Sequence, residues 1–186
     1  MALLSSDRIV CTAREIVRTE GHERLSVRGL ARQLNVTAPA IYDHLESKDA
    51  VLRAVAAAGY DELRATFSTS AETAIERMRE RGLAYVRFAQ TNPELFRLMF
   101  MFRPGAIAIE ADNELNAATE VFEAGFDDVR QAIADGELVD SDPTHLTLTM
   151  WAAVHGVATV SLLAPAVADA VAGDVIDAML TGLRPE

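Results

Sequence analysis

The stretch LSVRGLARQLNVTAPAIYDHLESK, residues 25–48, reads as two short helices joined by a tight turn and followed by the start of a third helix. Apolar residues in the first helix recur at i, i+3, i+4 and i+7, the spacing of one buried stripe; they are Val27, Leu30, Ala31 and Leu34. Asn35 follows, and asparagine tolerates the left-handed backbone that ends a helix. The stretch therefore predicts a helix-turn-helix, a motif that places its second helix in the major groove of DNA.

The second helix of the motif has a capping residue at its start and a largely polar outer face. Thr37 can cap the helix through its hydroxyl, and Pro39 falls in the first turn, where no N–H is needed. Ile41 is expected to point inward. The residues that face outward are Thr37, Ala38, Ala40, Tyr42, Asp43 and His44. The first residues of such a helix face the base edges.

Lys48 provides an independent indication of DNA binding. Ser47 is a good N-cap for the helix that starts at Lys48, so the ammonium lies at the positive end of a helix dipole. A cation there is destabilising by roughly 0.3–1 kcal/mol. A phosphate, however, is attracted both by the free N–H groups of a helix start and by an ammonium beside them. The pair therefore favours a contact with the DNA backbone.

These residues resemble the DNA-binding domain of the TetR family of bacterial transcription regulators. The resemblance rests on Ser26-Val27-Arg28-Gly29-Leu30-Ala31, on Tyr42-Asp43-His44 and on Ser47-Lys48. It implies that Tyr42 and His44 contact phosphates or thymine methyl groups, that Lys48 contacts a phosphate and that Arg28 contacts a base or a phosphate. It also implies that Thr37, Ala38 and Ala40 line the base-reading end.

Two features of the motif depart from the usual pattern. Asp43 places a carboxylate among the expected DNA contacts, where it repels phosphate and can only accept from an exposed amine such as cytosine N4. Ala38 and Ala40 offer methyl contacts alone, so the sequence of the operator cannot be inferred. Two alternatives remain: a helical corner with a purely structural role, and an all-α dimeric adaptor that does not bind DNA.

The charge of the chain is distributed unevenly. The chain has 186 residues, 50% of them hydrophobic, and a formal net charge of −11. Residues 1–50 hold seven basic and seven acidic side chains, so the whole excess of negative charge lies after residue 50. A chain without a broad cationic surface should bind random DNA weakly, through a few placed contacts that are sensitive to salt.

Cys11 is the only cysteine, which excludes an intramolecular disulfide and a cysteine-based zinc cluster and fits a reducing cytoplasm. We expect its thiol to be buried or half-buried. The N-terminus has too short an apolar stretch for a signal peptide. Residues 146–168 are almost uncharged, but their flanks are acidic and lack Lys and Arg, so we expect a buried helix instead of a membrane span. A cytoplasmic protein with no membrane partner is predicted.

The spacing of helix breaks predicts an all-α fold of about nine helices. The expected helices cover residues 5–20, 26–34, 38–45, 48–67, 71–91, 93–103, 106–136, 143–163 and 167–183. Residues 1–47 would form a three-helix DNA-binding domain, and residues 48–186 a helical effector-binding and dimerisation domain. The helix over 48–67 would connect the two and act as a lever between ligand and DNA.

The C-terminal half resembles a TetR subclass recognised by Trp-x-x-x-His-Gly, here Trp151, His155 and Gly156. The resemblance implies a cavity for an effector, which we expect to be a small hydrophobic molecule. The candidate lining residues are Phe88, Phe96, Met99, Phe100, Phe102, Trp151 and His155. Such a stripe of aromatic residues and methionines is also typical of an ordinary core. His155 is either a core histidine that bonds to a neighbouring helix or a polar anchor for the ligand.

The last two helices carry more apolar surface than one small subunit needs, which predicts a two-fold homodimer joined by a four-helix bundle. The expected interface residues are Ala152, Gly156, Val160, Leu163, Val175, Ile176, Met179 and Leu183. The four histidines lack the spacing of metal ligands, and no phosphate-binding loop or nucleophile motif occurs. We therefore expect no enzyme, no cofactor and no metal, but a dimeric repressor released from operator DNA by its effector.

Overall fold

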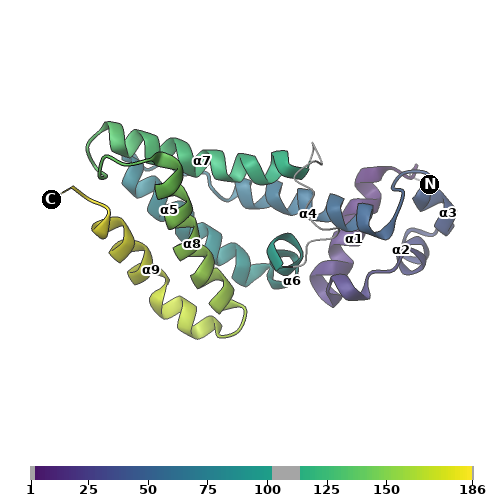
Figure 1. Ribbon diagram of the computed structural model, residues 1–186. Coiled ribbons are helices and arrows are strands. Elements are labelled where there is room, and N and C mark those ends of the chain that lie inside the picture. The colour runs from purple at the N-terminus through teal and green to yellow at the C-terminus, as the bar shows by residue number, and fades with distance from the viewer. Residues whose placement is uncertain (1–2, 102–113, 186) are drawn as a thin grey trace. The chain divides into compact units, whose positions relative to one another are not determined.

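The computed structural model describes residues 3–101 and 114–185, and every regular element in this part of the chain is helical. The helices are α1 (Ser6–Glu20), α2 (Val27–Leu34), α3 (Ala38–Tyr42), α4 (Lys48–Ala65), α5 (Ala74–Thr91), α6 (Pro93–Phe96), α7 (Glu114–Ala134), α8 (Pro143–Ser161) and α9 (Pro165–Gly182) (Figure 1). Two short elements accompany them, a 3-10 turn at His22–Arg24 and a π-helical segment at Arg97–Met101. The predicted all-α fold is confirmed.

Several helix bounds differ from the expected ones for local reasons. The expected helix over 93–103 is a single turn, α6, that passes into the π-helical segment at Arg97. α3 ends at Tyr42, earlier than expected, and α9 begins at Pro165 because proline suits the first turn of a helix. The expected helix over 106–136 begins outside the described residues, and its described part starts at Glu114.

The chain divides into two compact units. The head comprises residues 1–61 and 92–117, and the body comprises residues 62–91 and 118–186. The boundaries fall inside α4 and α7 and between α5 and α6. The functional boundary expected after residue 47 is of a different kind from this division by packing, and it stays a prediction.

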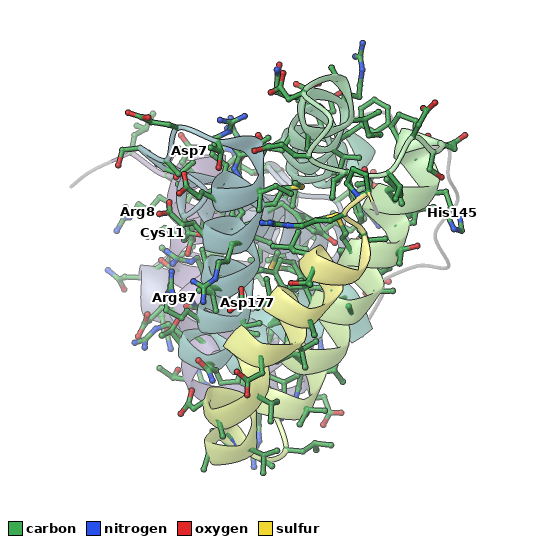
Figure 2. All side chains as sticks on the ribbon, turned by 90° about the vertical axis from the view of Figure 1, so that its left-hand side faces the viewer. Asp7, Arg8, Cys11, Arg87, His145 and Asp177 are labelled. Atoms are coloured by element: carbon green, nitrogen blue, oxygen red, sulfur yellow. The ribbon has the colours of Figure 1, made fainter. Side chains whose placement is uncertain are left out.

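The head is built on α1, which packs against α2 and against α6. Its core includes Ile9 and Val17 of α1 and Phe96 of α6, all without exposed surface. Cys11 is exposed, and it lies beside Asp7 and Arg8 on the outer side of α1 (Figure 2), so the expectation of a buried or half-buried thiol is wrong. Two positions along a helix turn a side chain by about 200°, which takes residue 11 away from the stripe of Ile9.

The body packs α5, α8 and α9 against one another, with α8 and α9 in the most extensive contact (Figure 1). Gly82 of α5 is buried and makes the close approach possible, because a Cβ there would lie 3.1 Å from Ile176 of α9 and 3.4 Å from Val154 of α8. Asp177 of α9, labelled in Figure 2, pairs with Arg79 of α5 at 2.6 Å. No helix within residues 3–101 and 114–185 has the length and apolar character needed to cross a bilayer.

Candidate functional site

The first helix of the motif is fixed by contacts within its own short segment. The Ser26 hydroxyl accepts a hydrogen bond from the Gly29 N–H at 3.1 Å and caps α2. Asn35 has the left-handed geometry expected of it, with φ 56° and ψ 46°, and its N–H donates to the Arg32 carbonyl. The predicted stripe is confirmed as core, since Leu30 is fully buried and its three partners are at most 9% exposed. The turn that orients the next helix therefore follows from local chemistry.

The second helix is short, and only part of the expected DNA-binding set lies on it. The Thr37 hydroxyl accepts from the Ala40 N–H at 3.4 Å, and Ile41 is fully buried beneath the helix. Tyr42, the last residue of α3, is 50% exposed. Asp43 and His44 follow the helix in a hydrogen-bonded turn and are exposed, so the expectation that they extend the recognition helix is wrong. Four helical residues remain before Tyr42, enough for a single turn.

Lys48 is the first residue of α4, and Ser47 caps that helix by accepting from the Ala50 N–H at 3.0 Å. Lys48 is half-buried, and it is the only lysine in the chain. The other expected DNA contacts all lie on the head and reach its surface: Arg28, Thr37, Tyr42, Asp43 and His44 are exposed, and Ala38 and Ala40 are partly exposed. The head thus presents the whole predicted set to solvent, and the role of each residue stays a prediction.

The expected effector-pocket residues are divided between the two units. Phe96 and Met99 are buried in the head, where a Tyr60 hydroxyl donates to the Met99 carbonyl at 2.9 Å and Phe100 packs edge-on to Tyr60. Phe88 is buried in the body and is not among the residues that line the pocket described next. Phe102 lies outside the described residues. Phe88, Phe96 and Met99 are therefore core residues of their units, and a role in a ligand pocket stays a prediction for them.

A pocket does lie in the body, and Trp151 is its one predicted member. Its cavity volume is about 100 Å³, and its walls come from α5, α7, α8 and the segment after α4. The lining residues are Phe67, Met78, Arg81, Gly82, Tyr85, Val121, Phe122, Gly125, Asp128, Val129, Thr147, Met150, Trp151 and Val154. Most are apolar or aromatic, as in sites for small organic molecules.

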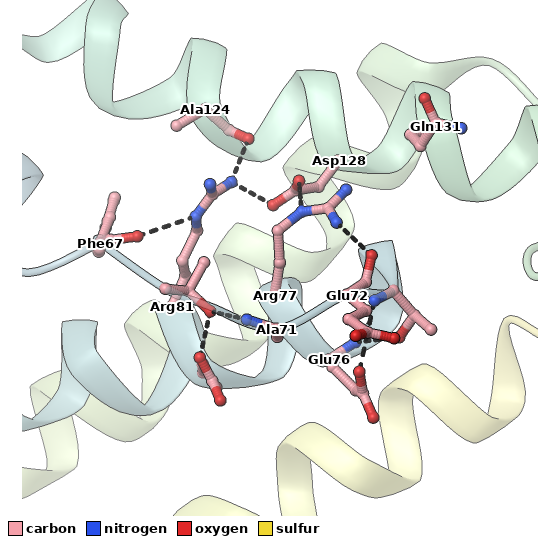
Figure 3. Close-up of polar contacts among 12 residues, drawn as sticks. Phe67, Ala71, Glu72, Glu76, Arg77, Arg81, Ala124, Asp128 and Gln131 are labelled. Carbon is pink, nitrogen blue, oxygen red and sulfur yellow. Dashed lines mark hydrogen bonds and ion pairs between the residues drawn. The ribbon is translucent and has the colours of Figure 1, made fainter.

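Arg77, Arg81 and Asp128 form a charged cluster (Figure 3), and Arg81 and Asp128 of this cluster line the pocket. Asp128 of α7 is only 4% exposed, and its two carboxylate oxygens accept from Arg77 Nε at 2.8 Å and from Arg81 Nη1. Arg81 also donates to the carbonyls of Ala124, at 2.7 Å, and of Phe67, at 3.3 Å. A buried carboxylate is tolerated when it is paired in this way. The cluster joins α5 to α7 and to the chain segment that leaves α4.

His155 bonds to a neighbouring helix, one of its two expected roles. The Tyr85 hydroxyl of α5 lies 2.8 Å from His155 Nδ1, and the imidazole stacks on Trp151 with ring centres 4.8 Å apart. Burial lowers the pKa of His155, because desolvation disfavours the charged imidazolium. His155 does not line the pocket, but it holds two residues that do, Tyr85 and Trp151.

The predicted interface residues occupy different environments. Val160 is 41% exposed and Leu163 is 83% exposed, and Ala152 and Gly156 of α8 are also exposed. Val175, Met179 and Leu183 are partly exposed. Ile176 is only 1% exposed and packs at Gly82, so it belongs to the core of the subunit and the expectation for it is corrected.

The sequence analysis did not predict the charged cluster at the pocket, although the sequence contains an indication of it. Arg77 and Arg81 are four residues apart on α5, near the buried Met78 and Tyr85, so two cations border an apolar face. Asp128 stands beside a second carboxylate, Asp127, within an otherwise apolar stretch. A cation and an anion on facing apolar stripes predict a buried pair, but the sequence alone does not show that α5 and α7 face each other.

Comparison with known proteins identifies the family. Residues 9–55 match the family of bacterial regulatory proteins called tetR, and residues 78–183 match the tetracyclin repressor-like C-terminal domain. The chain is 32% identical over 95 residues to the uncharacterised HTH-type regulator YobS of Bacillus subtilis, covering 48% of each chain. It is 26% identical to the HTH-type transcriptional regulator Rv1816 of Mycobacterium tuberculosis, covering 70% of this chain and 58% of that one.

The fold has a close solved counterpart. A Rhodococcus protein of unknown function superposes with a TM-score of 0.83 at 27% identity, covering 99% of this chain and 97% of the other. The chain spans about half the length of the curated relatives it matches. Proteins of the matched family are DNA-binding transcriptional regulators, which are not enzymes. With a helix-turn-helix in its head and a family match that spans most of its body, this chain belongs to the TetR family of transcriptional regulators.

Proposed function

We propose that this protein is a homodimeric repressor that leaves its operator when a small molecule occupies the pocket of the body. The observation that carries the DNA-binding part is the surface formed by α3, the turn after it and the start of α4. In this segment Tyr42 and His44 are exposed, and Lys48 begins a helix that Ser47 caps. A repressor needs only to occupy promoter DNA, so no further protein surface is required.

The residue types around α3 suit backbone contact better than base reading. Lys48 and the N–H groups at the start of α4 would clamp one phosphate, while Tyr42 and His44 would contact phosphates or thymine methyl groups. Arg28 of α2 would contact a base or a phosphate. Thr37, Ala38 and Ala40 would line the base-reading end, and Asp43 would exclude most bases except a cytosine.

Titration of a labelled DNA fragment from the protein's own upstream region tests this proposal. Lys48→Ala should weaken binding to all sequences by a similar factor and lower the slope of log affinity against log salt by about 1. Tyr42→Ala should also weaken binding. Arg130→Ala removes one exposed cation from the body and serves as the control. Equal affinities for all four proteins would favour the dimeric adaptor without DNA binding.

The response to a ligand is supported by the position of Arg81. Its guanidinium lines the pocket and donates to the carbonyl of Phe67, two residues after α4 ends at Ala65. α4 begins at Lys48, so one continuous helix leads from the edge of the pocket to the proposed phosphate contact. A change at Arg81 can therefore alter the hold on one end of α4, and a small rotation of α4 would change the separation of two recognition helices.

The dimer is supported by an uncovered apolar face on α8. Leu148, Ala152, Gly156 and Val160 recur every four residues and are exposed, and no described atom lies within 4 Å of the Cβ position of Gly156. Such a stripe lets a second helix approach closely. A two-fold dimer through α8 and α9 would form a four-helix bundle and pair two heads for half-sites about 34–36 Å apart.

Sedimentation at micromolar concentration tests the dimer, and a monomer alone would contradict it.

We also place the chain in the Trp-x-x-x-His-Gly subclass. Trp151 and His155 stack and form one unit with Tyr85, and Gly156 is exposed on the face opposite the pocket wall. In this assignment the first two signature residues shape the pocket and the glycine serves the interface.

A further inference from the structure

The charged cluster of Arg77, Arg81 and Asp128, of which Arg81 and Asp128 line the pocket, holds more positive than negative charge. Arg77 and Arg81 share the single carboxylate of Asp128, so the three side chains together carry one positive charge in excess. Among the described residues no second carboxylate pairs with either guanidinium. The nearby Arg77 Nη1 donates to the backbone carbonyl of Glu72, which is neutral. The surplus positive charge is therefore not balanced by any carboxylate within the cluster.

Arg81 also has hydrogen-bonding capacity in reserve. A guanidinium has five N–H groups, and Arg81 uses Nε for the Phe67 carbonyl and Nη1 for the Ala124 carbonyl and Asp128. No acceptor in the described part of the chain bonds to Nη2, which leaves two N–H groups. Because the side chain is only 21% exposed, an anionic acceptor brought to Nη2 would be weakly screened.

The remaining walls limit what else such an acceptor can carry. Phe122 and Trp151 lie with ring centres 5.4 Å apart, and the rest of the uncharged lining is largely apolar or aromatic, with polar groups on Tyr85 and Thr147. The cavity volume of about 100 Å³ is below the 150 Å³ or so of an apolar cavity that holds benzene. A molecule with one ring or a short branched chain is therefore the largest occupant that a small adjustment of the walls could admit.

We propose that the pocket binds a small monocarboxylate with one apolar ring or a short branched chain. Its carboxylate accepts from Arg81 Nη2, and its apolar part lies against Trp151 and Phe122. Asp128 stays bound between the two guanidiniums, so the incoming anion balances the surplus charge instead of replacing Asp128. This inference deepens the proposed ligand response and rests on it for its biological meaning, and it replaces a purely hydrophobic effector by an acid.

Trp151 is the only tryptophan in the chain, so its fluorescence reports occupancy of the pocket without DNA. The full-length protein is titrated with benzoate and phenylacetate and with their neutral analogues, benzamide and phenylacetamide. We expect the fluorescence to change saturably with each acid. Each acid should bind at least tenfold more tightly than its amide, a difference in binding free energy of about 1.4 kcal/mol. Amides that bind as tightly as the acids, or the absence of saturable binding by both acids, would overturn the proposal.

A pair of variants on α5 locates the preference for the acid. Arg81→Gln should abolish the difference between acid and amide, whereas Arg79→Gln should keep it, because Arg79 pairs with Asp177 away from the pocket. Should Arg81→Gln fail to fold by circular dichroism, Arg81→Lys keeps the charge but not the fork of donors, and should narrow the difference. An unchanged difference in a folded Arg81 variant would contradict the assignment of Arg81.

Operator titration separates this inference from the proposed function. If the acids bind selectively and do not change operator affinity, the ligand class stands and the ligand response fails. If operator affinity responds only to neutral apolar molecules, the ligand response stands and the carboxylate assignment fails.

Discussion

α2 and α8 differ in how their apolar residues are distributed around the helix. In α2 the four apolar stripe residues are buried, and Arg28, Arg32 and Gln33 are exposed. In α8 apolar residues occur all around the helix, so Leu148 is 51% exposed and Val160 is 41% exposed while Val154 is buried. The pattern of α2 alone shows which face of the helix is buried and which is exposed. The pattern of α8 does not, and the helices that pack against α8 decide which of its residues become pocket wall, core or free surface.

The same contrast extends to polar residues. In the motif, hydroxyl caps at Ser26, Thr37 and Ser47 bond three residues ahead, so their partners are fixed by the sequence. In the body, Arg81 and Asp128 meet across 47 residues, and their pairing exists only in the folded chain. Loss of a local cap should therefore lower the free energy of unfolding only a little, whereas loss of either partner of a buried long-range pair should lower it strongly.

The largest expected effect comes from the long-range pair. Asp128→Ala leaves two guanidiniums without their carboxylate and should lower the free energy of unfolding by about 3–5 kcal/mol. The midpoint of urea unfolding measures this loss. Asp127→Ala removes an exposed carboxylate one residue away and should stay within about 0.5 kcal/mol. Similar losses in the two variants would show that Asp128 is not the long-range anchor that the comparison requires.

The next largest effect concerns the uncovered apolar face. Leu163→Glu places a charge on a residue that is 83% exposed in the single chain. If that residue is covered in the dimer, the dissociation constant should rise at least about thirtyfold, near 2 kcal/mol. Sedimentation velocity over a concentration series measures the change. Leu3→Glu, at a 92% exposed leucine of the head, is the control, and an equal response of both variants would argue against an interface there.

A local cap should have a smaller effect. Ser47→Ala removes the acceptor for the Ala50 N–H at the start of α4 and should lower stability by about 1 kcal/mol. Thermal unfolding measures it, with Ser68→Ala as an exposed loop control. A loss as large as that of Asp128→Ala would mean that the head depends on longer-range contacts than its sequence suggests.

The smallest expected effect is a dependence on pH. The pKa of His155 is lowered by burial, so the unfolded chain takes up a proton near pH 6.5 before the folded chain does. Stability should therefore decline as pH falls below about 6.5, and the decline should end once the folded-state pKa is passed. His155→Gln should flatten this part of the profile, whereas His145→Gln, at an exposed position of the same helix, should keep the slope. If the slope of stability against pH is unchanged in His155→Gln, the burial of His155 is not its cause.

Much of the head could be predicted because its signals lie within a few residues of one another. The stripe of α2, the left-handed Asn35 and the caps at Ser26, Thr37 and Ser47 all follow from nearest-neighbour chemistry. The early end of α3 was missed, because helix propensity does not distinguish a last helical residue from the first residue of a turn. The exposure of Cys11 does not follow from the apolar residues beside it in the sequence, because the helical angle turns its side chain away from theirs.

The pocket could be predicted only in part. Trp151 stood out by its chemistry, but Phe96 and Met99 have the same character and lie in the core of the head. Ile176 resembles Val175 and Met179 in chemistry, but it lies on the buried face of α9 with Ala172 and Leu180, where it packs at Gly82 of α5. Residue type predicts that such side chains avoid water, and it does not identify which of them meet.

The sequence by itself determined that the chain is helical, where most helices begin and end to within about three residues, and that the head carries a helix-turn-helix of the TetR type. These properties depend on backbone hydrogen bonds and on periodicity over a few residues, which the order of amino acids states directly. Only the tertiary structure decided that Arg81, Asp128 and Trp151 line one pocket and that Ile176 is core. Those facts depend on contacts between residues tens of positions apart, and such contacts exist only once α5, α7, α8 and α9 have packed.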